Sequence, residues 1–279
     1  NGGGAFVLVY LLCIALIGIP VMIAEVMLGR RAQRSPISTM QVLAKEQGAS
    51  GFWQIIGWSG VFAGFLILSF YSVIAGWAMA YVIESASGTF NAISGDGSGD
   101  VFGGLIGDPQ RLMIWHTLFM IMTVAVVARG VRAGIEKLVV ILMPLLLAML
   151  LILVAYAFNS GEFGRGLAYL FSFDFSKLST DSIIVAMGHA FFTLSLGMGA
   201  IMVYGSYMQK NTSIGSSVLM IAIADTVVAL LAGLAIFPLV FANGLEPGAG
   251  PGLVFVTLPT AFGAMPGGQF FGTVFFVLL

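Results

Sequence analysis

The stretch Gly188-His-Ala-Phe-Phe-Thr-Leu-Ser-Leu-Gly-Met-Gly-Ala-Ile-Met-Val-Tyr-Gly-Ser-Tyr207 lies inside a hydrophobic segment that is long enough to cross a bilayer. Its middle, Ser195-Leu-Gly-Met-Gly199, places two glycines and a serine where a spanning helix should be most regular. A break there frees backbone N–H and C=O groups that lipid cannot satisfy, so it must face protein, water or a bound solute. With hydroxyls at Thr193 and Ser195, it is typical of a mid-membrane binding site in a secondary transporter. The alternative for this stretch alone is a kinked helix contact packed through small residues.

The composition around this stretch indicates an integral membrane protein. Of the 279 residues, 59% are hydrophobic and 8% are charged, whereas soluble proteins carry about 25% charged residues. Long apolar segments favour an all-α polytopic protein over the short alternating strands of a membrane barrel. The single cysteine, Cys13, excludes an intrachain disulfide. No Walker loop, dinucleotide fingerprint, metal-ligand cluster or nucleophile elbow occurs, so we expect no enzyme, no cofactor and no nucleic-acid partner.

Seven apolar segments are predicted to span the membrane, at about residues 5–29, 54–85, 112–128, 138–158, 183–208, 217–242 and 269–279. The last is cut short and the chain opens at Asn1-Gly-Gly-Gly, so we expect a fragment of a longer protein, incomplete at both ends. Three connections are predicted to be extracellular. Residues 86–110 are interpreted as a solvated connector, residues 159–181 as an amphipathic interfacial segment, and residues 243–268 as a re-entrant or capping loop.

Basic residues gather on one side of this predicted topology. Eight fall on one side: Arg30, Arg31, Arg34, Lys45, Arg129, Arg132, Lys137 and Lys210. Three fall on the other: Arg111, Arg165 and Lys177. The positive-inside rule therefore predicts that residues 30–53 are cytoplasmic. We expect the protein to lie in the cell (inner) membrane.

Few polar groups within the spans could carry chemistry. Asp225 is expected to bind a cation or carry a proton, with a structural carboxylate as the alternative. Glu25 lies within a turn of the cytoplasmic arginines and could simply pair with them. Tyr71 needs a buried partner, either a substrate carboxylate or a helix carbonyl. His189 could titrate, although a lone buried histidine is more often a neutral hydrogen-bonding group.

Two separate motifs resemble the neurotransmitter:sodium symporters, the family of the bacterial leucine transporter. Asn1-Gly-Gly-Gly-Ala-Phe6, followed by Gly18-Ile-Pro20 and Glu25-Val-Met-Leu-Gly-Arg30, is similar to the second helix of that family. Phe191-Phe-Thr-Leu-Ser-Leu-Gly-Met-Gly-Ala200 is similar to its unwound sixth helix. The resemblance covers essentially the whole chain, from the second helix to the start of the eighth. It implies part of an inverted-repeat transporter fold with a discontinuous central helix, whose first helix is among those missing.

The resemblance assigns a substrate pocket residue by residue. Tyr71 matches the tyrosine that meets the substrate carboxylate, and Ile67 matches an apolar wall of the pocket. Phe192 matches the aromatic lid, while Ser195 and Met198 line the pocket at the break. Because Met198 stands where the leucine transporter has an aromatic residue, the pocket floor is altered. A polarizable methionine adapts to varied shapes, which favours large hydrophobic or aromatic amino acids.

The remaining matches concern ions, gating and support. Thr193 matches a ligand of the first sodium ion beside the substrate, and Asp225 falls where many members have an asparagine ligand. Tyr207 matches a cytoplasmic-gate tyrosine, and Glu25 is placed as a support for the unwound segment.

The pattern also departs from that of the animal members. Ala229 replaces a serine that helps to hold chloride, and His189 stands in place of a glutamine, whereas Tyr10 keeps the family tyrosine. A carboxylate at Asp225 can offset the sodium charge without an anion, so we predict chloride independence. The functional prediction is sodium-coupled amino-acid symport by alternating access. The alternatives are a non-transporting membrane sensor or subunit that uses the same site, and proton coupling through His189 and Asp225.

Overall fold

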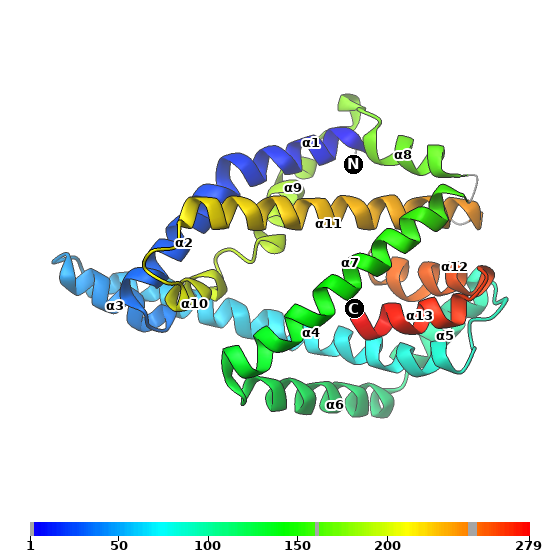
Figure 1. Ribbon diagram of the computed structural model, residues 1–279, viewed down its shortest axis with the longest axis horizontal. Coiled ribbons are helices and arrows are strands. Elements are labelled where there is room, and N and C mark those ends of the chain that lie inside the picture. Colours follow the sequence, from blue (N-terminus) through cyan, green and yellow to red (C-terminus); the bar gives the residue numbers. More distant parts are fainter. Residues whose placement is uncertain (1–2, 160–161, 245–249) are drawn as a thin grey trace. The chain divides into compact units, whose positions relative to one another are not determined.

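The computed structural model describes residues 3–159, 162–244 and 250–279, including all their side chains except those at 131–133. The described chain is almost entirely helical, as predicted (Figure 1). It divides into two compact units. The first comprises Asn1–Leu68 with Tyr169–Ala229, and the second comprises Ser69–Ala168 with Leu230–Leu279.

The first unit begins with one continuous helical stretch that contains a wider turn. Helix α1 (Gly4–Cys13) passes through a π-helical turn (Ile14–Gly18) into α2 (Ile19–Ala32). Pro20 lies directly after the π turn, and a proline and a widened turn both interrupt the regular hydrogen-bond ladder of an α-helix. The stretch ends where Gln33 adopts left-handed geometry at a φ of 51°.

The predicted span 183–208 is two helices in the structure. Helix α9 (Thr180–Thr193) and helix α10 (Ala200–Tyr207) are separated by a non-helical segment, which Figure 1 shows as a thin connection. Helix α9 packs along α1, and α10 packs along α2. The α2–α10 contact is so close that a Cβ built on Gly29 would lie 2.0 Å from the Met202 carbonyl oxygen. The predicted discontinuity of this helix is therefore confirmed.

A polar stretch after α2 forms a further helix in this unit. Helix α3 (Pro36–Glu46) follows Ser35, whose side chain accepts a hydrogen bond from the Ser38 N–H and caps the helix. A 3-10 turn (Gly51–Trp53) then leads into α4 (Gln54–Ala86). Helix α4 and helix α11 (Ile214–Ala242) are long enough to contribute residues to both units.

The second unit contains α4 from Ser69 onward, α11 from Leu230 onward, and several further elements. These are α5 (Gly95–Ile106), α6 (Pro109–Val127), a π turn (Val131–Glu136), α7 (Lys137–Phe158), α8 (Phe163–Phe171, up to Ala168), a π turn (Leu253–Thr257), α12 (Leu258–Ala264) and α13 (Gly268–Leu278). Its core is centred on Tyr81, which is completely buried and contacts the rings of Phe90, Phe255 and Phe276. The Tyr81 hydroxyl donates to the Phe255 carbonyl at 2.8 Å.

Two predicted connections contain more helix than the sequence indicates. Residues 86–110 were interpreted as a solvated connector, but they include α5, whose Ser98 and Leu105 are buried. The Ser94 side chain caps this glycine-rich helix, and tertiary packing of its apolar residues overrides the low helix propensity of glycine. In the predicted loop 243–268, the described residues form the π turn and α12, while 245–249 lie outside the described residues.

Five helical stretches of the described chain are long and apolar enough to cross a membrane: Gly4–Ala32, Gly51–Ala86, Pro109–Val127, Gly134–Phe158 and Ile214–Ala242. Helix α13 is apolar but shorter, and α9 and α10 are short because of the break between them. These stretches indicate a multi-pass membrane protein.

Candidate functional site

The break after α9 is a regular helix-ending motif rather than a disordered gap. The Leu196 N–H donates to the Phe191 carbonyl at 2.9 Å, and the Ser195 N–H donates to the Phe192 carbonyl at 3.1 Å. These two bonds form the Schellman pattern that closes the last turn of a helix. Two terminal carbonyls of helix α9 are therefore satisfied within the chain, which helps the helix to end inside the membrane segment.

The residue at the left-handed position of this motif is a serine. Ser195 has a φ of 55°, a conformation that costs a side-chain-bearing residue about 1–2 kcal/mol and is normally left to glycine. The two glycines that follow, Gly197 and Gly199, have φ values of 79° and 75° and adopt such geometry freely. Strained backbone at a residue other than glycine is often found at functional sites, so Ser195 is a candidate for a functional residue.

Glu25 of α2 supports the break from one side. Its Oε1 atom accepts a hydrogen bond from the Gly197 N–H at 2.8 Å. Its Oε2 atom is buried and has no hydrogen-bond partner among the described residues. Glu25 thus satisfies one backbone donor that the break releases, and its role as a support for the unwound segment stays a prediction.

A polar cluster lies where α9 ends. The Thr193 hydroxyl donates to Oδ2 of Asp225 at 2.8 Å, which joins the last residue of α9 to α11. The ring of Tyr10, from α1, packs on His189 with centroids 5.1 Å apart. The Tyr10 hydroxyl is buried close to Thr193, and no residue in the described part of the chain forms a hydrogen bond of normal geometry with it. Four residues singled out in the sequence, from three helices, therefore meet in the first unit.

The predicted pocket residues lie on different elements of the fold. Ser195 and Met198 belong to the break itself, and Phe192 lies in the last turn of α9, 44% exposed. Ile67 belongs to the first unit and Tyr71, 44% exposed, to the second, although both lie on α4. The structure thus brings Thr193 and Asp225 together. The substrate-binding roles of Ile67, Tyr71, Phe192, Ser195 and Met198 stay predictions.

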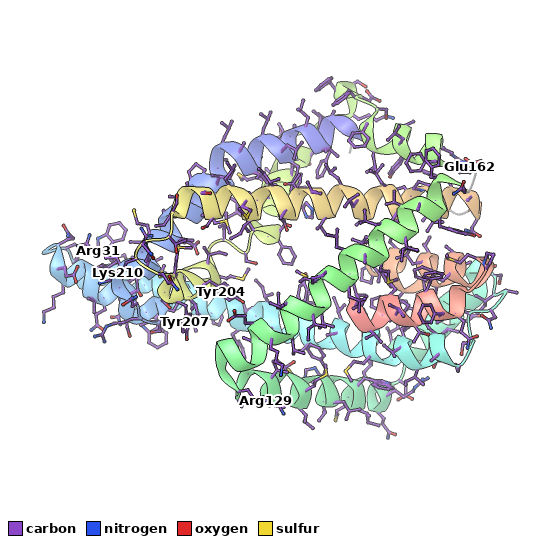
Figure 2. All side chains as sticks on the ribbon, viewed as in Figure 1. Arg31, Arg129, Glu162, Tyr204, Tyr207 and Lys210 are labelled. Carbon is purple, nitrogen blue, oxygen red and sulfur yellow. The ribbon has the colours of Figure 1, made fainter. Side chains whose placement is uncertain are left out.

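The predicted gate residue lies away from the break. Tyr207 ends α10 and is 59% exposed, and Figure 2 shows it close to the chain that leads to Lys210. Ala229, at the predicted chloride position, is exposed on α11 four residues beyond Asp225. Neither residue contributes to the cluster at Thr193.

Two contacts of the break were missed in the sequence. A Cβ built on Gly60 of α4 would lie 3.2 Å from the Gly199 nitrogen and 3.2 Å from the Met198 carbonyl carbon. A Cβ built on Gly199 would lie 2.9 Å from Cγ of Pro36, at the start of α3. The spacing of Gly57, Gly60 and Gly64 in an apolar helix is a signal of close packing that could have found the first contact.

This arrangement can hold both a cation and an anionic group. A carboxylate and a hydroxyl supply hard oxygen atoms, which suit a cation such as sodium. Helix α10 begins at Gly199 with no side-chain cap, so its first N–H groups are available to an anion. Among the described residues there is no group of three or more His, Cys, Asp or Glu side chains that could hold a metal ion.

A multi-pass helical protein with a helix broken beside a part-buried polar cluster has the architecture that is typical of secondary transporters. The profile of the Sodium:neurotransmitter symporter family matches residues 1–92 and 105–279. The chain belongs to this family, which confirms the resemblance seen in its motifs.

Individual relatives agree with this assignment. The chain is 40% identical over 277 residues to YhdH, an uncharacterized sodium-dependent transporter of Bacillus subtilis (strain 168), covering 99% of this chain and 60% of that protein. It is 35% identical over 285 residues to an uncharacterized sodium-dependent transporter of Haemophilus influenzae, covering 100% and 62%. The crystal structure of MhsT in complex with L-phenylalanine matches with a TM-score of 0.92 and 47% identity, covering 100% of this chain and 63% of that one. The chain therefore spans about 60% of the length of the relatives that it matches.

Proposed function

We propose that the protein is a sodium-coupled symporter that moves amino acids by alternating access. The observation that carries this proposal is the hydrogen bond between Thr193 and Asp225 at the end of a broken membrane helix. Family membership and the sodium-dependent relatives support the same conclusion.

The sodium site proposed here uses the oxygen atoms of Thr193 and Asp225. The Thr193 hydroxyl is the donor in its hydrogen bond to Asp225. The lone pairs of its oxygen can therefore face a cation while this hydrogen bond is kept. The carboxylate supplies a full negative charge, which compensates a monovalent cation in a region of low dielectric constant. Further oxygen ligands would come from backbone carbonyls near the break.

The proposed substrate is a large hydrophobic or aromatic amino acid. Its carboxylate would be bound by the uncapped N-terminus of α10 and by Tyr71, as the family resemblance implies. Its side chain would lie against Ile67, Phe192, Ser195 and Met198. The similarity to MhsT, which was crystallised with L-phenylalanine, supports this class of substrate.

The charge of Asp225 also supports the proposal that transport does not need chloride. Asp225 is hydrogen-bonded within the same cluster as Tyr10 and His189, while the nearby position 229 carries an alanine. A fixed carboxylate next to a sodium ion takes over the compensating role of a bound anion. The proposed orientation, in an inner membrane with residues 30–53 in the cytoplasm, follows from the distribution of basic residues.

Uptake by the full-length protein in proteoliposomes tests these proposals together. Labelled L-phenylalanine should accumulate against its gradient when external sodium is present, and not when choline replaces sodium. Accumulation should be equal in chloride and gluconate media, and loss of uptake in gluconate would contradict chloride independence.

Binding without accumulation would indicate a sensor instead. Loss of uptake on collapse of the pH gradient, with sodium kept, would indicate proton coupling through His189 and Asp225.

A further inference from the structure

Three other elements of the first unit contact the backbone of the non-helical segment between α9 and α10. Glu25 of α2 accepts the Gly197 N–H at 2.8 Å. The two remaining contacts involve the backbone of Met198 and Gly199, and come from α4 and α3. None of them comes from a neighbouring turn of α9 or α10.

The contact from α4 depends on the absence of a side chain at Gly60. A Cβ there would lie 3.2 Å from both the Gly199 nitrogen and the Met198 carbonyl carbon, and 3.4 Å from the Gly197 oxygen. The two distances of 3.2 Å are shorter than ordinary van der Waals contacts between such atoms, and the distance of 3.4 Å is at the short end of the ordinary range. The atoms that would be crowded belong to the backbone, so they cannot rotate away as the end of a long side chain could.

The contact from α3 comes through its first residue. Pro36 is buried, and its ring occupies the space where a side chain on Gly199 would have to lie. The same turn of α3 packs equally closely on α4, because a Cβ on Gly57 would lie 2.6 Å from the Ile37 Cα. The first turn of α3 is therefore packed against both α4 and the break.

We propose that Gly60 and Pro36 are positioning residues for the substrate and sodium site, which hold Met198 and Gly199 in place from two sides. This inference rests on the proposed function, because it assigns the segment that they hold to substrate binding. It also connects the site to α3, so that a displacement of this polar helix is transmitted to the break through Pro36.

The test uses the full-length protein with Gly60→Ala, Pro36→Ala and the double variant. Gly215→Ala is the matched control, since a Cβ built on Gly215, also in the first unit, meets no atom within 4 Å. Equilibrium binding of labelled L-phenylalanine in saturating sodium gives affinity and number of sites, and thermal unfolding reports the fold. The extra Cβ in Gly60→Ala overpacks against fixed backbone, so this variant should bind L-phenylalanine about tenfold more weakly than wild type. The number of sites and the melting temperature should be nearly unchanged.

The double variant distinguishes positioning from a general loss of packing. If both residues press on the same segment, Pro36→Ala gives that segment room and restores part of the affinity lost in Gly60→Ala. Multiplicative losses in the double variant would overturn the proposal, and so would wild-type affinity in Gly60→Ala.

A second readout keeps the inference separate from the proposed function. Hydrogen exchange of the peptide that covers residues 194–200 should be faster in Gly60→Ala than in wild type and Gly215→Ala, with no substrate present. If wild type binds no amino acid, the proposed function fails. Hydrogen exchange still tests whether Gly60 holds the segment between α9 and α10 in place. Unchanged exchange in Gly60→Ala would overturn the inference even if wild type transports.

Discussion

The carboxylate of Glu25 and the backbone N–H of Gly197 are hydrogen-bonded at 2.8 Å, although they are 172 residues apart in the chain. Gly197 lies within a break that releases backbone donors, and lipid offers them no acceptor. Glu25 therefore satisfies a donor of the break, which its place in the sequence close to Arg30 and Arg31 did not require. The carboxylate faces the break instead of pairing with those arginines among the described residues.

Removal of this acceptor should loosen the break. In Glu25→Ala the exposed Gly197 N–H loses its carboxylate partner, and we expect a loss of about 1 kcal/mol for this hydrogen bond. Glu25→Gln keeps a carbonyl oxygen in the same place and should retain most of the stability. Hydrogen exchange of the break and thermal unfolding of the purified protein compare the two variants. Equal effects of alanine and glutamine would show that the hydrogen bond is not what supports the break.

The hydroxyl of Thr193 should determine sodium affinity. Thr193→Val removes the hydroxyl with little change in shape, leaving Asp225 without its donor and the proposed ion without one oxygen. Hydrogen bonds to charged groups contribute about 1.5–3 kcal/mol, so the sodium concentration for half-maximal uptake should rise about tenfold or more. Thr193→Ser, which keeps the hydroxyl, is the control. Unchanged sodium dependence in Thr193→Val would remove Thr193 from the ion site.

Two substitutions at Ser195 should separate backbone strain from side-chain function. Ser195→Gly relieves the left-handed φ of 55° and should raise the free energy of unfolding by about 1 kcal/mol. Ser195→Ala keeps the strain and should leave stability nearly as in wild type. Both lose the hydroxyl, so both should bind L-phenylalanine more weakly if Ser195 lines the pocket. Melting temperatures and binding isotherms measure the two effects separately, and wild-type affinity in both variants would exclude the hydroxyl from the site.

The second unit offers an independent test of a buried polar contact. Tyr81→Phe keeps the stacking on Phe90 but leaves the Phe255 carbonyl without the hydroxyl donor, 2.8 Å away in wild type. The expected loss is about 1–3 kcal/mol, with local loosening of the turn that precedes α12. Thermal unfolding and hydrogen exchange of residues 253–262 measure it. An unperturbed exchange pattern would mean that ring packing alone fixes this segment.

Several features of the fold could be predicted because they depend on neighbouring residues in the chain. Apolar runs of spanning length and the Ser195-Leu-Gly-Met-Gly199 interruption are local patterns, so the helical class and the broken helix followed from them. Helix α5 was missed for the converse reason. Its glycine-rich sequence has little intrinsic helix preference, and packing against the second unit's core stabilises it instead.

The sequence by itself determined that this protein crosses the membrane as helices, that one of them is interrupted, and which family it belongs to. Only the tertiary structure decided that Glu25 bonds to Gly197, that Thr193 meets Asp225, and that Gly60 and Pro36 pack on the break. The physical reason is that helix formation and interruption follow from short-range backbone preferences. Contacts between distant residues depend instead on how helices pack, and packing is decided by the shapes of all the side chains together.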